Sequence, residues 1–160
     1  MIKESLEELR RKVDEYGRRY RHPDLDELEL LGPYALSQDD TFVTDPKMRW
    51  DKQWPNSDRA GVYVIYSQDG TLLYIGKALH LGKRLANYFQ YEFPVTKDKR
   101  CRVIPEWKPT PMYVCTIAVP QKSRFEACAL EEYLINESKP KPRINVRVDP
   151  HWREGAISAA

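Results

Sequence analysis

Two short runs of strand-forming residues, separated by a tight turn, constrain the fold of this chain more than any other feature. Residues 61–66 read GVYVIY and residues 73–77 read LYIGK. Both runs are rich in β-branched and aromatic residues, and the intervening segment contains an Asp-Gly turn signal at Asp69 and Gly70. We therefore expect an antiparallel β-hairpin here.

The alternation of side chains along these strands predicts where the tyrosines point. Tyr63 and Ile65 should share one face of the hairpin, and Tyr66 should take the other. If the hairpin closes at the Asp-Gly turn, Tyr74 comes alongside Tyr63. The sequence thus predicts two tyrosines on neighbouring strands of one rigid frame.

Two amphipathic helices are expected after the hairpin. Ser123 and Glu126 fit a capping box, so one helix should start near Ser123, carry Glu131 and end before Pro140. The other follows Lys77, where a helical stripe recurs at three- and four-residue spacing: Leu81, Arg84, Leu85, Tyr88 and Phe89.

The motifs GVY, YIGKA, LEEYLI and PRIN occur in the order and spacing of a known family. They resemble the GIY-YIG endonuclease superfamily, most closely the N-terminal nuclease domain of the excinuclease C type. The resemblance implies an α/β (α+β) fold with a small, mostly antiparallel three-stranded sheet flanked by helices. Residues 112–119 should supply the third strand, and this chain adds an N-terminal helix and loop segment.

The resemblance also implies a set of catalytic residues. Tyr63 and Tyr74 match the paired tyrosines, Lys77 a recurring site position, and Arg84 the helix arginine. Glu131 matches the metal-binding glutamate because it opens the pattern Glu-x-x-Leu-Ile. Other positions match the substrate-binding part of the site: Gly76, Tyr88 and Asn145.

These residue types suit metal-dependent hydrolysis of a phosphodiester. Mg²⁺, or Mn²⁺ in its place, takes one or two carboxylates and fills its shell with water and phosphate oxygens, so Glu131 suffices as the protein ligand. Arg84 supplies a permanently charged planar fork for phosphate. A tyrosine with a pKa near about 10 is a poor base at neutral pH, so Tyr63 or Tyr74 needs help from Lys77, the metal or a hydrogen-bond relay. Which tyrosine takes the proton of the water is left open.

The resemblance implies DNA as the partner, and the distribution of charge indicates where the DNA should lie. Residues 1–60 contain eleven Lys or Arg and fourteen Asp or Glu, a net charge of −3, whereas residues 71–112 contain eight and three, a net charge of +5. We expect the phosphate backbone to lie along the basic cluster that follows the arginine helix. That cluster consists of Lys97, Lys99, Arg100 and Arg102.

We divide the chain into an extension at 1–60, a nuclease domain at 61–150 and a tail at 151–160. Ser5 with Glu8 fits a capping box, and the apolar stripe that follows predicts a helix that packs on the sheet or binds a partner. The stripe consists of Leu6, Leu9, Val13, Tyr16 and Tyr20. Residues 22–60 should form a loop-rich segment around the core.

The sequence contains no apolar run long enough to span a membrane, and its start lacks a secretory signal, which favours the cytoplasm. Three cysteines without paired spacing support neither disulfides nor a zinc site, and Cys115 and Cys128 should lie in a strand and a helix core.

The expected function is that of a small stand-alone DNA endonuclease. A catalytically silent nucleic-acid-binding or partner-binding module and a restriction or mobile-element endonuclease are the alternatives. The preference for single-stranded, duplex or structured DNA is left open.

Overall fold

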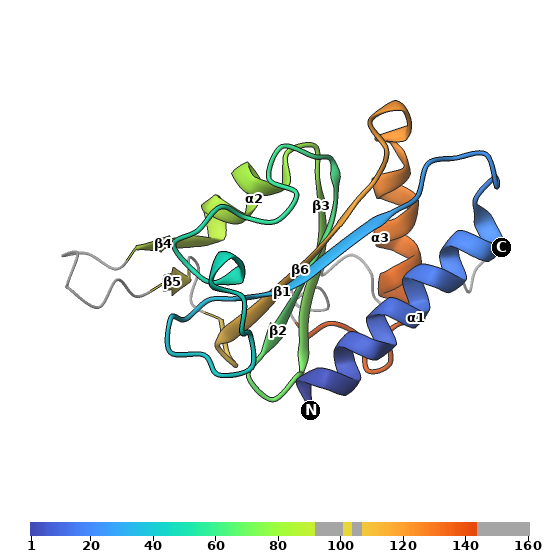
Figure 1. Cartoon of the computed structure of the whole chain (residues 1–160). Helices are drawn as coiled ribbons and strands as arrows, with labels where there is room; N and C mark the ends of the chain where they lie inside the picture. The colour runs from blue at the N-terminus through green and yellow to red at the C-terminus, as the bar shows by residue number, and fades with distance from the viewer. Residues whose placement is uncertain (92–100, 104–106, 144–160) are drawn as a thin grey trace, which may run out of the picture.

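The computed structural model of the chain describes residues 1–91, 101–103 and 107–143 (Figure 1). None of the helices in this described part combines the length and apolar character needed to cross a bilayer. In chain order the elements are α1 (Ile2–Tyr20), β1 (Glu29–Ala35), η1 (Pro46–Met48), β2 (Gly61–Ser67), β3 (Leu72–Ala78), α2 (Leu81–Tyr88), β4 (Phe89–Tyr91), β5 (Cys101–Val103), β6 (Pro111–Ala118), η2 (Gln121–Ser123) and α3 (Glu126–Glu137).

The central sheet is antiparallel and has the strand order β1-β6-β2-β3, while β4 and β5 form a separate two-stranded ribbon. The expected α+β fold is confirmed, but the sheet has a fourth strand. β1 comes from the segment that was expected to be loop-rich. Gly32 and Pro33 interrupt the apolar pattern of β1, and the register of its pairing with β6 shifts between Leu31 and Tyr34. The alternation of apolar and polar residues therefore did not predict this strand.

The predicted hairpin is present as β2 and β3. Tyr63 pairs with Gly76, and Ile65 pairs with Tyr74, so Tyr74 lies diagonally across from Tyr63 on the same face. Tyr66 belongs to the apolar cluster of the opposite face, as the alternation predicted.

Each face of the sheet has its own core. On one face, side chains of β2 and β3 such as Val64 and Ile75 pack with Leu130 and Leu134 of α3 and with the buried stripe of α1. On the other face, a cluster includes Tyr63, Ile65, Leu81, Leu85 and Phe89. Figure 1 shows this arrangement, with α1 and α3 on one side of the sheet and α2 on the other.

Helix α1 packs on this core with Leu9, Val13 and Tyr16 buried. It begins at Ile2, so the predicted capping box at Ser5 is wrong. The Ser5 hydroxyl lies inside the helix and donates instead to the Gly70 carbonyl oxygen of the hairpin turn, at 2.7 Å. A long-range partner has thus replaced the local one.

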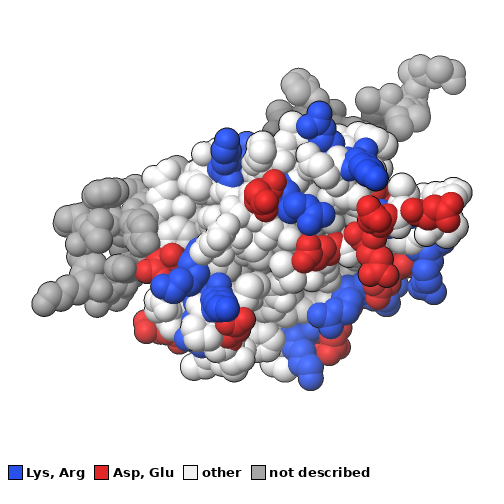
Figure 2. All heavy atoms as spheres, turned by 45° about the horizontal axis from the view of Figure 1, so that its top comes forward, with Lys and Arg blue, Asp and Glu red and all other residues white. Residues whose placement is uncertain are grey.

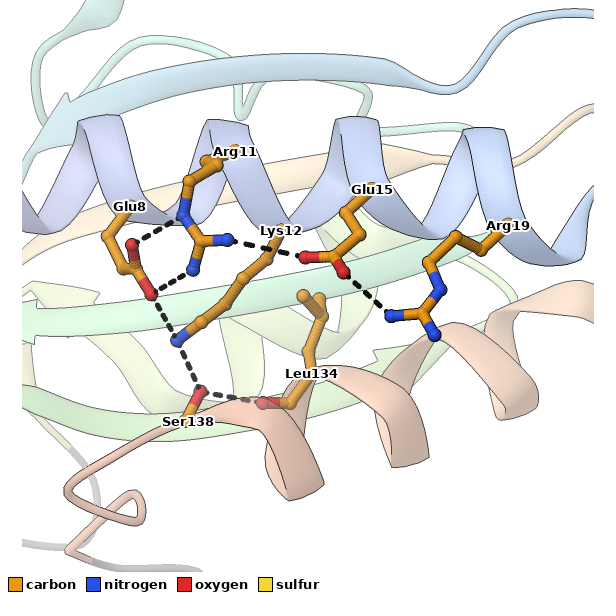
Figure 3. Close-up of polar contacts among 7 residues, drawn as sticks. All are labelled: Glu8, Arg11, Lys12, Glu15, Arg19, Leu134 and Ser138. Atoms are coloured by element: carbon orange, nitrogen blue, oxygen red, sulfur yellow. Dashed lines mark hydrogen bonds and ion pairs between the residues drawn. The ribbon is translucent and has the colours of Figure 1, made fainter.

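A polar network joins α1 to the end of α3 (Figure 3). Lys12 Nζ lies 3.2 Å from a Glu8 carboxylate oxygen and donates to Ser138 Oγ at 3.5 Å. The Ser138 hydroxyl in turn donates to the Leu134 carbonyl oxygen at 2.6 Å. Because Lys12 and Ser138 are both buried, this contact fixes the position of α1 against α3.

The start of α3 also differs from the prediction. Ser123 ends the short helix η2, and α3 begins at Glu126. The Ser123 hydroxyl bonds to the Glu126 carboxylate at 3.2 Å, and that carboxylate also accepts from Arg21. Cys115 is buried in β6 as expected, whereas Cys128 is exposed on α3, which corrects its predicted place in the helix core.

Candidate active site

Three tyrosines from three elements form one cluster on the α2 side of the sheet. Tyr63 of β2, Tyr74 of β3 and Tyr88 of α2 have ring centroids 5.9 to 6.1 Å apart in every pair. The Tyr63 hydroxyl donates to the Tyr88 hydroxyl oxygen at 3.2 Å. The ring of Trp107 packs against those of Tyr74 and Tyr88, with centroid distances of 5.6 and 5.5 Å.

Gly76 lets the tyrosines approach so closely. A Cβ at this position would lie 2.4 Å from Tyr63 Oη and 2.6 Å from a ring carbon of Tyr74, far inside van der Waals contact. The strand pairing of Tyr63 with Gly76 therefore requires the absence of a side chain. This is a physical reason for the motif glycine between the two tyrosines.

Both motif tyrosines are neutral phenols at neutral pH. Burial, together with the hydrogen bond to Tyr88, raises the pKa of Tyr63 far above its ordinary value. Burial, followed by the charge of Tyr88, raises the pKa of Tyr74 to about 12, and the negative charge of Glu131 adds to the effect. Tyr63 is fully buried, whereas Tyr74 is only half-buried and so is the more accessible of the two.

Lys77 and Glu131 meet on the other side of the same strand. Lys77 Nζ donates to Glu131 Oε2 at 2.5 Å, which raises the pKa of Lys77 above its ordinary value. β3 is an edge strand of the described sheet, so no other strand lies between the Lys77–Glu131 pair and the tyrosine cluster. The candidate site therefore occupies both faces of β3 at this edge of the described sheet, and the negative charge of Glu131 contributes to the raised pKa of Tyr74.

Arg84 borders the tyrosine cluster from α2. Its guanidinium carbon lies 6.0 Å from the centroid of the Tyr88 ring, and the side chain is exposed. Arg84 forms no ion pair with any residue that the structure describes. Its charge is thus available to an incoming anion.

The donor set of the site suits a magnesium-type ion rather than a closed metal centre. Within the described residues, no group of three or more His, Cys, Asp or Glu side chains could enclose a metal. A lone carboxylate at a partly open edge, as Glu131 offers, is how Mg²⁺ binds when water and substrate phosphates complete its octahedron.

Several predicted site residues cannot be placed. Arg102 belongs to β5, where its backbone pairs with Gln90, but its side chain is outside the described part of the chain. The remaining ones lie outside the described residues altogether: Lys97, Lys99, Arg100 and Asn145. Their expected roles stay predictions.

The antiparallel sheet, the tyrosine cluster around a motif glycine, and the flanking arginine and glutamate define the GIY-YIG class of nuclease domain. Residues 59–146 match the family model of the UvrC-like GIY-YIG domain. The chain belongs to this family.

Three relatives illustrate the similarity, each named UvrABC system protein C. The protein of Cytophaga hutchinsonii is 35% identical over 109 residues, which is 68% of this chain and 17% of the relative. That of Dictyoglomus thermophilum is 29% identical over 115 residues, 72% of this chain and 17% of the relative. That of Pseudomonas syringae is 37% identical over 98 residues, 60% of this chain and 14% of the relative. The chain thus matches less than a fifth of the length of these relatives.

Proposed function

We propose that this protein is a metal-dependent DNA endonuclease in which the residues around the edge of β3 act on one scissile phosphate. The observation that carries the proposal is the arrangement around β3: Tyr74 lies on one face, the Lys77–Glu131 pair on the other, and Arg84 of α2 lines the same groove as Lys77. Each side chain supplies one requirement of phosphodiester hydrolysis.

Glu131 would hold Mg²⁺ or Mn²⁺ as the protein ligand. When bound, such an ion supplies Lewis-acid stabilisation of the phosphate and lowers the pKa of bound water. Lys77 keeps the carboxylate oriented toward the edge of β3 by its hydrogen bond. Because that bond raises the pKa of Lys77, its amine remains charged and serves as a cation rather than a base.

Arg84 would bind a non-bridging phosphate oxygen, since its planar fork has no ion-pair partner among the described residues. Tyr74 would relay the proton of the attacking water, accepting it while its own hydroxyl proton passes to solvent, because its half-buried hydroxyl is the accessible one. Tyr63 is fully buried and would act as a positioning residue, holding Tyr88 through its hydrogen bond.

The substitution Glu131→Gln tests the metal site, with Glu132→Gln as its neighbouring control. Glu132 is exposed and accepts a hydrogen bond from Asn136, whereas Glu131 accepts one from Lys77. Glu131→Gln keeps the shape of the side chain but loses the anionic ligand, so cleavage and Mn²⁺ binding should collapse while the fold and most DNA affinity remain. If both variants cleave DNA as fast as the parent protein, Glu131 is not part of the active site.

We further propose that the nuclease acts on single-stranded or structured DNA. The neighbouring basic groove described below supports this preference. Cleavage assays on matched single-stranded, duplex and flapped DNA, with Mg²⁺, Mn²⁺ or EDTA, test both the metal requirement and the substrate. Faster cleavage of perfect duplex than of single-stranded and flapped DNA would contradict the proposed substrate preference.

A further inference from the structure

An open groove of about 640 Å³ lies beside the candidate active site, between α2 and the beginning of α3. Its volume falls within the range of about 300 to 1,000 Å³ that is common for ligand pockets. The described residues that line it include no Asp or Glu, and its ionisable side chains other than Cys128 are basic: Lys77, His80, Lys83, Arg84 and Arg124.

Lys77 of this groove pairs with Glu131, but two other cations of the groove differ from the paired cations found on other parts of the surface. Over the face drawn in Figure 2, Lys and Arg side chains are interspersed with Asp and Glu side chains. On α1, for example, Arg11 and Arg19 both pair with Glu15. By contrast, Lys83 and Arg124 are exposed and form no ion pair with the part of the chain that the structure describes. Their charges are therefore left for an external anion.

Two large apolar side chains line the same groove. Phe125 is 75% exposed and Leu79 is 62% exposed. A single exposed apolar residue needs no explanation, but an accessible aromatic ring beside basic side chains is a composition that binds single-stranded nucleic acid. Bases stack on the ring while the cations contact phosphates.

We propose that this groove binds an unpaired, single-stranded segment of the DNA substrate. Phe125 stacks on an exposed base, Lys83 and Arg124 contact backbone phosphates, and the strand then passes Arg84 to reach the edge of β3. In a duplex both faces of a base are already stacked on neighbouring bases, so no base is free to stack on the Phe125 ring. The identity of the occupant as DNA depends on the proposed nuclease function, whereas the groove itself does not.

The test measures the affinity of the protein for a labelled oligothymidine in the presence of EDTA, which prevents metal-dependent cleavage. Phe125→Ala should weaken single-strand binding roughly 5- to 160-fold, which corresponds to about 1 to 3 kcal/mol for one stacked base, and leave duplex binding within about twofold. Phe125→Trp should preserve it. The matched control is Phe42→Ala, since Phe42 is also exposed but follows β1 at the opposite edge of the sheet.

A second pair of variants tests the phosphate contacts. Replacing Lys83 and Arg124 together by alanine should make the dependence of log affinity on log salt shallower by about 1.4, because single strands release about 0.7 counterions per contact. Unaltered thermal unfolding of each variant shows that the fold is intact, as expected for exposed positions.

Unchanged single-strand affinity in Phe125→Ala, or an equal loss on duplex, would overturn the stacking proposal. An unchanged salt slope in the double variant would overturn the phosphate contacts. A parent protein that binds oligothymidine through Phe125 but cuts no DNA with Mg²⁺ or Mn²⁺ would refute the proposed nuclease reaction and leave the groove assignment standing.

Discussion

Arg21 and Glu126 form a buried ion pair that ties the end of α1, in the N-terminal extension, to the first residue of α3. Arg21 Nε donates to Glu126 Oε1 at 2.5 Å, and both side chains are only 8% exposed. Arg21 lies outside the matched family region, 59–146, while Glu126 lies within it. The extension thus holds the end of the helix that carries Glu131.

Breaking this pair should be costly. Arg21→Met leaves the Glu126 carboxylate buried without its cation, so we expect the free energy of unfolding to fall by about 3 kcal/mol or more. Urea denaturation measures the change. Arg19→Ala removes an exposed ion pair with Glu15 and should cost under about 1 kcal/mol. Similar losses in the two variants would show that burial does not set the energy of the Arg21 pair.

Gly76→Ala should damage both stability and activity. The new methyl group would overlap the Tyr63 hydroxyl and the Tyr74 ring, so the tyrosines must move apart, at a cost of about 1 to 3 kcal/mol. Gly17→Ala is the control, because nothing lies within 4 Å of its added Cβ in α1. It should stabilise the helix by about 0.5 to 1 kcal/mol and leave cleavage unchanged. A fully active Gly76→Ala enzyme would contradict the close-packing argument.

The two motif tyrosines should respond differently to loss of a hydroxyl. Tyr74→Phe should lower kcat about 10²- to 10⁴-fold with little change in stability, because the ring still packs and only proton transfer is lost. Tyr63→Phe should cost about 0.5 to 1.5 kcal/mol of stability, since it removes the hydrogen bond to Tyr88. Single-turnover cleavage and thermal unfolding separate the two effects. A larger loss of kcat in Tyr63→Phe would make Tyr63 the proton-transfer residue.

Stability should decline at alkaline pH. Burial raises the pKa of Tyr63 and Tyr66, and raises that of Tyr74 to about 12, so the folded protein holds these protons more tightly than the unfolded chain, whose tyrosines have a pKa near about 10. Their contribution is therefore complete below about pH 10 and is lost as the pH rises toward the folded pKa. Denaturation at stepped pH, with phenolate absorbance, checks this. A stability that stays level above about pH 10 would contradict it.

The fifth prediction concerns the basic cluster that follows the arginine helix. Replacing its four Lys and Arg residues together should weaken DNA binding and flatten its salt dependence, because fewer counterions are released. Filter binding at several salt concentrations measures both quantities. If the affinity and its dependence on salt concentration are unchanged, the cluster is not part of the DNA interface. Its residues are Lys97, Lys99, Arg100 and Arg102.

Local patterns were sufficient where neighbours in the sequence determine the structure. Alternation along 61–66 and 73–77 predicted the hairpin, the shared face of Tyr63 and Ile65, and the opposite face for Tyr66. The apolar stripe of the first helix predicted its buried face, because a 3.6-residue period arises within one helix. Motif spacing also nominated Glu131, which the structure places beside the edge of β3.

Capping boxes failed because other partners competed for the same side chains. Ser5 bonds to the Gly70 carbonyl, and Ser123 bonds to a Glu126 carboxylate that also pairs with Arg21. A serine hydroxyl takes the best acceptor that folding brings near it, and that acceptor can lie far away in the sequence.

Local sequence is enough to specify the hairpin, the spacing of the tyrosines and the glycine that lets them meet, since these depend on alternation and steric size over a few residues. Tertiary packing, in contrast, is what joins β1 to β6, packs Trp107 on the tyrosines and fastens α3 through Arg21. Those relationships connect segments whose approach depends on the packing of the whole core, and no local period in the chain encodes that packing.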